Sequence, residues 1–388
     1  MKKIIASYVI GIVGLFFMPT PVAAQEFVEN ITRFFEFDVG KRYEDSTKFT
    51  SKVVLAPVAS YEPSTSLGLG VGAKFLFKFA GSGLETRTSN IPLSLTYTFR
   101  NQFIFYSGYT VFFNQEKYLL KGNLEYSKFP LEYFGRGSLT RDENKRAIEF
   151  DNLLIQPLLL KKVAKSLFVG GGIRYNNIFN TQLGEEEGEL PKGTSLQDEL
   201  GSSSLGLEMA ITFDSRDNVL NASTGNFLEF THGFYEKSFG STHNFMLTKL
   251  DFRQYFQPNY SQEDIIALQW YTRLSWDDTP PLELSTLGGP ELLRGFQENR
   301  FRDRFAFFAQ VEYRWQALDR IGFVFYAGAG DVVDGLDEVK WNNIKYSVGS
   351  GFRLKIIKSE NLNIRFDYAL GLGAIKDNNF YLGIAESF

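Results

Sequence analysis

Side chains between Phe305 and Trp315 alternate strictly in kind. One face would carry five bulky apolar residues and an alanine, and the other would end in a glutamine, a glutamate and an arginine. Successive residues of a β-strand point to opposite sides, so this strand would separate an apolar solvent from a polar one. Similar alternation predicts about sixteen strands, near 52–61, 66–79, 89–100, 103–114, 117–128, 146–160, 165–178, 204–214, 226–238, 241–256, 263–275, 305–316, 319–331, 343–357, 360–372 and 377–388.

These segments predict an all-β fold, a transmembrane antiparallel β-barrel of about sixteen strands that occupies residues 52–388. In a soluble β-sandwich the apolar faces would form a core. Charged residues recur too regularly on the opposite faces for that arrangement, as in Asn363, Arg365 and Asp367. Single-chain bacterial barrels have an even number of strands, and closure leaves no strand edge exposed to lipid.

The first residues are typical of a secretory signal. Lys2 and Lys3 precede an apolar run, and Val22-Ala23-Ala24 supplies small residues for cleavage. We therefore expect a signal peptide at 1–24, export through the Sec pathway and a final location in the bacterial outer membrane. Residues 25–51 alternate poorly and are expected to form a short periplasmic segment.

Composition argues against several classes of protein. The chain has no cysteine and two histidines, so we expect no metal and no cofactor. Its net charge of -4 gives no support for nucleic-acid binding. We also expect no enzymatic activity and no catalytic residues, because His232 shares its face with apolar residues and 201–205 lacks the pattern of a serine nucleophile.

Two long inserts interrupt the strands. Residues 184–203 are acidic and are expected to form a solvated surface loop. Residues 277–304 contain Leu293-Arg294-Gly295-Phe296 and a further group of charges. Long connections of such barrels lie outside the cell and short turns lie in the periplasm.

Several local patterns occur together in a defined order. They are the Leu293–Phe296 motif, Asp214-Ser215-Arg216-Asp217-Asn218 followed by Gly225, the sequence Gln310–Arg314, the region 347–371 and an aromatic Phe388. The chain from about residue 52 onward resembles the barrel of the Omp85 superfamily, the BamA/TamA family that is also called bacterial surface antigen D15.

The resemblance implies that the sixth extracellular loop folds back into the lumen, where acidic residues hold Arg294. Glu312 matches the first acid of the family by position. The second acid is expected where this chain has Gly328. Either Glu312 holds Arg294 alone, or Asp331 substitutes for the missing acid.

The resemblance also implies a lateral seam between the first and last strands, with Val54, Ala56, Leu382, Ile384 and Phe388 as its candidate residues. Pro57 removes a backbone donor from the first strand, which is consistent with a weak edge. Phe388 is expected to close the final strand, although Glu386 departs from the apolar residue that the family has there.

The implied function is assembly, insertion or translocation of proteins or lipids at the outer membrane. The implied partners are outer-membrane lipids and unfolded outer-membrane proteins. Family members carry periplasmic POTRA domains, and residues 25–51 are too few to form one, so this POTRA-less form is expected to use a separately encoded periplasmic partner. The alternative is a passive channel or structural barrel that keeps the fold without insertase activity.

Overall fold

The computed structural model of the protein describes most of the chain after residue 50. The described residues are 36–38, 51–62, 66–83, 86–99, 101–183, 200–219, 221–258, 263–357, 362–384 and 386–388. The expected signal peptide, most of the expected periplasmic segment and most of the acidic insert lie outside these residues.

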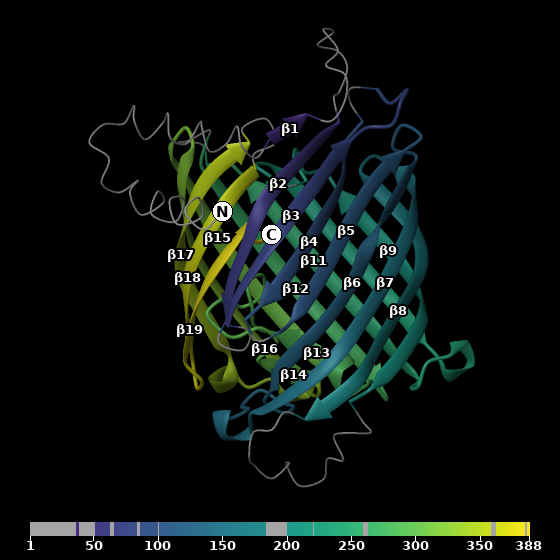
Figure 1. The fold of residues 1–388 in the computed structure, drawn as a ribbon, viewed down its shortest axis with the longest axis vertical. Helices are drawn as coiled ribbons and strands as arrows, with labels where there is room; N and C mark the ends of the chain where they lie inside the picture. Colours follow the sequence, from purple (N-terminus) through teal and green to yellow (C-terminus); the bar gives the residue numbers. More distant parts are fainter. Residues whose placement is uncertain are drawn as a thin grey trace.

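Long tilted strands form the wall of a barrel (Figure 1). They are β2 (Lys52–Glu62), β3 (Ser66–Phe77), β4 (Ser89–Thr98), β5 (Phe103–Phe113), β6 (Tyr118–Tyr133), β7 (Arg146–Ala164), β8 (Leu167–Leu183), β9 (Ser202–Asp214), β10 (Gly225–Tyr235), β11 (Phe245–Phe256), β12 (Ile265–Asp277), β15 (Phe305–Leu318), β16 (Ile321–Val333), β17 (Lys345–Ile357), β18 (Leu362–Leu372) and β19 (Asp377–Ile384).

Shorter elements lie in the connections. They are β1 (Glu36–Asp38), β13 (Ser285–Leu287), β14 (Phe301–Asp303) and the 3-10 turns η2 (Asp142–Asn144), η3 (Lys237–Phe239), η4 (Pro281–Glu283), η5 (Leu336–Glu338) and η6 (Trp341–Asn343). Among the described residues, no helix has the length and apolar character needed to cross a membrane.

Consecutive wall strands pair antiparallel along the whole series from β2 to β19, and β12 pairs directly with β15. The two ends of the series, β2 and β19, lie next to each other. Over the described parts of these two strands no residue-by-residue register joins them, so the ladder does not close there. The short β1 pairs with Lys52, Val53 and Val54 at the start of β2.

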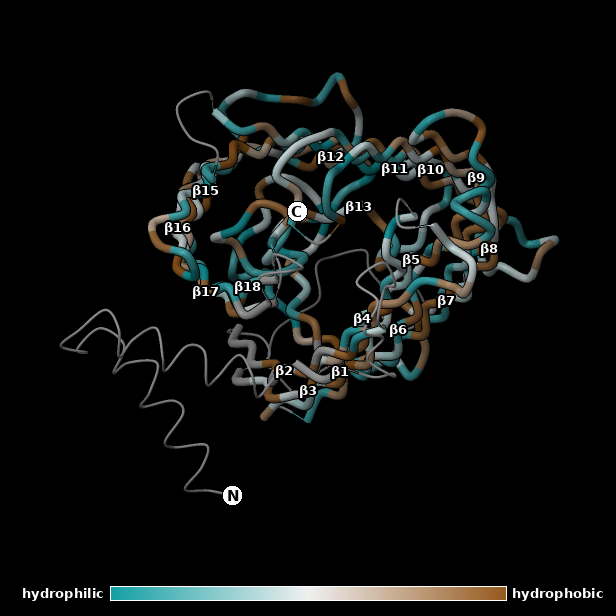
Figure 2. The backbone as a smooth tube through the Cα atoms, turned by 90° about the horizontal axis from the view of Figure 1, so that it is seen from above, coloured by the Kyte–Doolittle hydropathy of each residue, from teal (hydrophilic) through white to brown (hydrophobic). Residues whose placement is uncertain are grey.

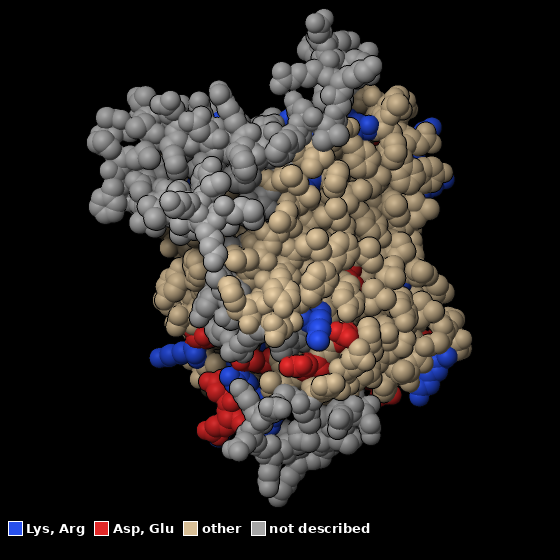
Figure 3. All heavy atoms as spheres, in the orientation of Figure 1, with Lys and Arg blue, Asp and Glu red and all other residues tan. Residues whose placement is uncertain are grey.

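The two faces of the wall meet different surroundings, as the alternation predicts. On β9, Glu208, Thr212 and Asp214 point inward and are buried, whereas Leu207 and Met209 are more than half exposed on the outside. Seen from above, the strands form a ring with part of the chain inside it (Figure 2). On the outer face shown in Figure 3, charged side chains gather toward the two ends, and a band largely without charge lies between them.

The fold class is confirmed: the protein is all-β and each predicted strand is present. The strands β6, β7 and β8 extend several residues beyond the predicted ends. Their extra residues include Glu132 and Gln182, which keep their ladder partners although polar residues there no longer alternate with a lipid-facing set. Outside the hydrocarbon layer a ladder needs no apolar face, so hydropathy does not mark its end.

Candidate functional site

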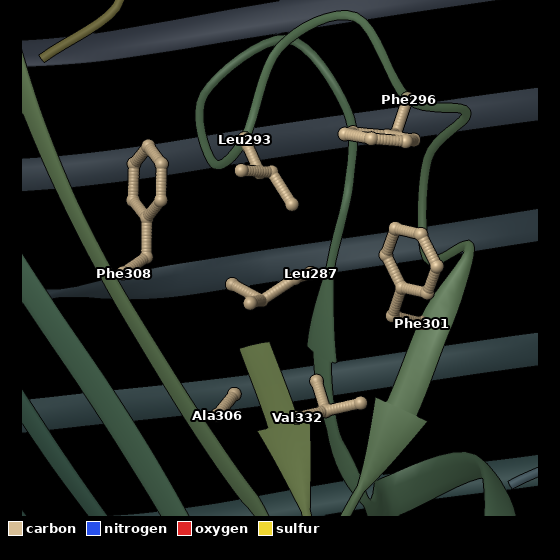
Figure 4. Close-up of a cluster of buried hydrophobic side chains, with 7 residues drawn as sticks. All are labelled: Leu287, Leu293, Phe296, Phe301, Ala306, Phe308 and Val332. Carbon is tan, nitrogen blue, oxygen red and sulfur yellow. The ribbon is translucent and has the colours of Figure 1, made fainter. Parts of the chain in front are cut away.

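The connection 278–304 between β12 and β15, here called loop six, folds back into the barrel. Its β13 and β14 pair as a small antiparallel sheet. Leu287, Leu293, Phe296 and Phe301 of the loop form a buried apolar cluster with residues of the wall (Figure 4), which are Ala306 and Phe308 of β15 and Val332 of β16. These side chains fix the loop in place by burial of apolar surface, which positions the neighbouring Arg294.

Arg294 is buried and reaches two carboxylates on different strands. Its Nη2 donates to Glu312 Oε2 on β15 at 2.8 Å, and its Nη1 donates to Asp367 Oδ2 on β18 at 3.2 Å. Nη2 also donates to Gln310 Oε1 at 3.1 Å, and the guanidinium carbon lies 3.4 Å from the ring centre of Tyr326. A guanidinium suits this site because its planar donors satisfy several acceptors at once while its face stacks on an aromatic ring.

Asp331 does not contact Arg294, which corrects the expectation that it could serve as the second acid. Asp331 instead pairs with Lys345, and it accepts a hydrogen bond from Ser138 Oγ at 2.7 Å. The Lys345 ammonium lies 4.6 Å from the ring centre of Phe301, beneath the end of loop six. Asp331 therefore belongs to a separate buried ion pair.

The second acid is supplied by Asp367 and not from β16, where the family pattern places it. Gly328 leaves no room for an acid, because a Cβ built there would lie 2.8 Å from Cε2 of Phe308. The Phe308 ring fills the space that an aspartate would need. Asp367 on β18 thus takes the place of an acid at position 328 on β16, and Arg294 still pairs with two carboxylates.

The residues after Arg294 bind the last strand. The Gly295 N–H donates to the Tyr381 hydroxyl at 3.0 Å, and that hydroxyl donates to the Phe296 carbonyl at 3.0 Å. Asn379 Nδ2 donates to the Gly295 carbonyl at 3.0 Å. Gly295 has a φ of 101°, and a Cβ there would lie 2.5 Å from the backbone nitrogen of Gly371, so only glycine fits.

The base of loop six is anchored on β8. Glu283 accepts hydrogen bonds from Arg174 Nη1 at 3.2 Å and Nη2 at 2.8 Å, and from Asn176 Nδ2 at 2.7 Å. Burial alone would raise the pKa of the Glu283 carboxyl, but the charge and hydrogen bonds of Arg174 outweigh burial and lower it. The base is thus held by a charge-assisted fork.

The connection 134–145 between β6 and β7 also binds loop six. Arg300 donates to Thr140 Oγ1, to the Thr140 carbonyl and to the Asp142 carboxylate, each at 2.8 Å. The Gly137 N–H donates to the Arg302 carbonyl at 2.8 Å. Loop six is therefore joined to four parts of the barrel: the wall strands β15 and β18, the last strand β19, the strand β8, and the connection between β6 and β7.

A sequence model described as the Omp85 superfamily domain matches residues 164–388, more than half of the chain. The chain belongs to the Omp85 superfamily. Omp85 membership agrees with the ordered motifs and the inward loop, and it makes the protein a bacterial outer-membrane barrel. Comparison with curated protein sequences gives no match.

Two solved Omp85-type barrels have a similar fold. A BamA from Haemophilus ducreyi lacking POTRA domains 1-3 shares 13% identity with a TM-score of 0.56, over 94% of this chain and 77% of that one. CdiB from Acinetobacter baumannii shares 12% identity with a TM-score of 0.58, over 86% of this chain and 59% of that one. At this identity the likeness concerns the fold.

The predicted seam residues of this Omp85 barrel fall into two groups. Val54 and Ala56 lie on β2 opposite Lys74 and Gly72 of β3, and Leu382 and Ile384 lie on β19 opposite Phe366 and Ile364 of β18. The side chains of Val54, Ala56 and Ile384 lie outside the described residues. Phe388 does not extend β19: it is buried inside the ring, where Figure 2 marks the end of the chain.

Sequence reasoning missed several residues of the Omp85 site. They are Asp367, Gln310, Tyr326, Asn379 and Tyr381. Asp367 was visible as part of the polar face of its strand, but alternation shows which residues face the lumen and not which of them meet. Among the described residues, no group of three or more histidines or acids has the arrangement of a metal site.

Proposed function

We propose that this Omp85 barrel inserts or translocates proteins at the outer membrane, and that the seam between β2 and β19 is the working site. The observation that carries the proposal is the interruption of the ladder at this seam, while the strands on either side of it have complete registers. Superfamily membership supports the same class of function.

An open strand edge offers a row of unpaired backbone donors and acceptors, which pairs readily with another extended chain. On β19 the register with β18 covers Asp377 to Ile384, which leaves its other edge toward β2. We infer that an unfolded outer-membrane protein adds its strands at this edge and that surrounding lipid receives them. A separately encoded periplasmic partner would bring such clients, after export of the barrel itself through the Sec pathway.

Loop six has the position of an internal brace in this proposal. The motif Arg294–Phe296 joins β15 and β18 to Tyr381 and Asn379 of β19. Loop six therefore holds β19 from the lumen side, whereas no ladder holds β19 on the side of β2. Arg294 would set how far β19 can move, without contacting a client.

The test is client folding in liposomes. One cysteine in β2 and one in β19 are joined by a disulfide across the seam, which is unambiguous because the chain has no other cysteine. We expect the open barrel to accelerate folding of an unfolded outer-membrane protein, the disulfide to abolish the acceleration, and reduction to restore it. Undiminished acceleration by the disulfide-closed barrel would refute the role of the seam.

The second candidate function is a passive channel or structural barrel. It is favoured by the contents of the lumen, where a cavity of about 420 Å³ remains whose lining includes paired charges such as Lys121, Glu229 and Asp251. For a passive channel plugged by loop six, deletion of 288–304 raises single-channel conductance. If client folding is never accelerated and this deletion opens the channel, the second candidate replaces the first.

A further inference from the structure

Residues 386–388, here called the inner segment, turn away from the wall after β19 and enter the lumen. The side chain of Glu386 is buried, and its Oε2 accepts from Arg353 Nε of β17 at 2.7 Å. Ser387 Oγ donates to the Pro290 carbonyl of loop six at 2.9 Å. The inner segment therefore rests on the opposite side of the seam strand from the lipid.

Phe388 fills a small apolar site across the lumen. It packs with Ala222, Tyr255 and Ala267, and its ring centre lies 6.3 Å from that of Tyr255. Arg314 Nη2 donates to the main-chain oxygen of Phe388 at 2.9 Å, and the guanidinium carbon lies 5.4 Å from the ring centre. Ring and backbone are both recognised, so the docking is specific and not simple filling of space.

One chain of ion pairs joins this site to loop six through β15. Glu312 accepts from Arg294 through Oε2 at 2.8 Å and from Arg314 through Oε1 at 3.0 Å. The same Arg314 nitrogen holds Phe388. The two arginines thus share one carboxylate, and the position of that carboxylate depends on both of them.

A second chain joins the same ends through β18 and β17. Asp367 accepts from Arg294 at 3.2 Å through Oδ2 and from Arg353 at 2.5 Å through Oδ1. Arg353 in turn holds Glu386. Two separate relays of buried charges therefore connect Arg294 to the two ends of the inner segment, and all their side chains are at most 7% exposed.

We propose that the inner segment is a latch whose docking is energetically coupled to the seating of Arg294. When Arg294 leaves its clamp, Glu312 loses one of its two cations and Asp367 one of its three, and each carboxylate rearranges toward the cations that remain, which displaces Arg314 and Arg353 from the inner segment. Coupling is reciprocal, so release of the inner segment weakens the clamp equally. The consequence for insertion rests on the proposed function, because the latch lies directly beyond the seam strand β19.

The test measures latch docking without a client. In the folded barrel in detergent micelles, Ala222→Cys and Ser387→Cys are joined by a short thiol crosslinker, and the rate of crosslinking reports docking. Ser387→Cys also removes the direct hydrogen bond to Pro290, so an effect of Arg294 must pass through the relays. The matched control is Arg300→Ala, a buried arginine of the same loop whose partners Thr140 and Asp142 belong to neither relay.

We expect Arg294→Ala to lower the crosslinking rate about fivefold or more, the range of measured couplings between sites, and Arg300→Ala to leave it unchanged. Equal rates in the parent and in Arg294→Ala, or equal losses in both variants, would overturn the latch. Should Arg294→Ala fold poorly, Glu312→Gln and Asp367→Asn each interrupt one relay and are expected to give smaller losses that combine in the double variant. Since no client is present, failure of the latch and failure of insertase activity are separate results.

Discussion

Tyr381 of the last strand holds the backbone of Gly295 in loop six, 86 positions earlier in the chain, by a hydrogen bond of 3.0 Å. The same hydroxyl also donates to the carbonyl of Phe296. One phenol group therefore satisfies two buried main-chain groups of the loop. It ties the loop motif to the strand that lies at the open seam.

Replacement of Tyr381 by phenylalanine is expected to destabilise the seating of loop six by about 1–3 kcal/mol, because it leaves a buried N–H and a buried carbonyl without this partner. Limited proteolysis of loop six and the unfolding midpoint of the barrel both measure the effect. Tyr346→Phe, on the exposed outer face of β17, is the matched control and should change neither. Equal behaviour of the two variants would contradict the brace.

A double-mutant cycle distinguishes the acid that holds Arg294 from the one that does not. We expect Arg294→Ala and Asp367→Asn to couple by about 0.5–3 kcal/mol, as residues in one ion-pair network do. Arg294→Ala with Asp331→Asn should be close to additive, since Asp331 pairs with Lys345. Denaturant unfolding of the four proteins in each cycle gives the coupling energies, and strong coupling to Asp331 would refute the assignment.

Restoring an acid at position 328 should harm this protein. Gly328→Asp places a side chain against the ring of Phe308, and overpacking of this kind costs about 1–3 kcal/mol or more. Gly328→Asp combined with Phe308→Ala should recover part of the loss, because the ring no longer occupies the space. The melting temperatures of the single and double variants measure this, and a stabilising single variant would contradict the steric account.

The base of loop six should loosen in acid. The pKa of Glu283 is lower in the folded state than its usual value near 4.3. Its contribution is therefore complete above that usual value and is lost as the pH falls through the lower folded-state pKa. Protease sensitivity of loop six should rise below about pH 4 in the parent, and Glu283→Gln should already show raised sensitivity at pH 7. Equal protease sensitivity of the parent and Glu283→Gln at pH 7 would contradict this linkage.

Alternation was sufficient to place the strands, because lipid on one side and water on the other impose a period of two on the sequence. It could not identify Asp367 as a partner of Arg294. That contact depends on how far β15 and β18 are staggered around the barrel, and two strands lie between them in the chain. Loop length and the Leu293–Phe296 motif predicted the inward loop but not its attachment to Tyr381.

At the end of the chain, the structure differs from the sequence-based prediction mainly in the path of the inner segment, which leaves the last strand and enters the lumen. Phe380 and Leu382 face outward on β19, so a continued strand would place Glu386 in lipid. An unpaired carboxylate there is costly, whereas Arg353 and Asn363 bind it in the lumen. The charge that departs from the family pattern was thus the sequence signal for the turn.

The short β1 makes the two ends of the open β2 edge different, because it pairs with only one of them. Glu36, Phe37 and Asp38 pair with the first three residues of β2, so the backbone groups of β2 at that end already have partners. The part of this edge that remains for an incoming strand begins at Leu55. An arriving strand would begin pairing there and would have to compete with β1 for the remainder. Under the proposed function, β1 would therefore occupy the start of the β2 edge, and only a sufficiently long incoming strand would displace it.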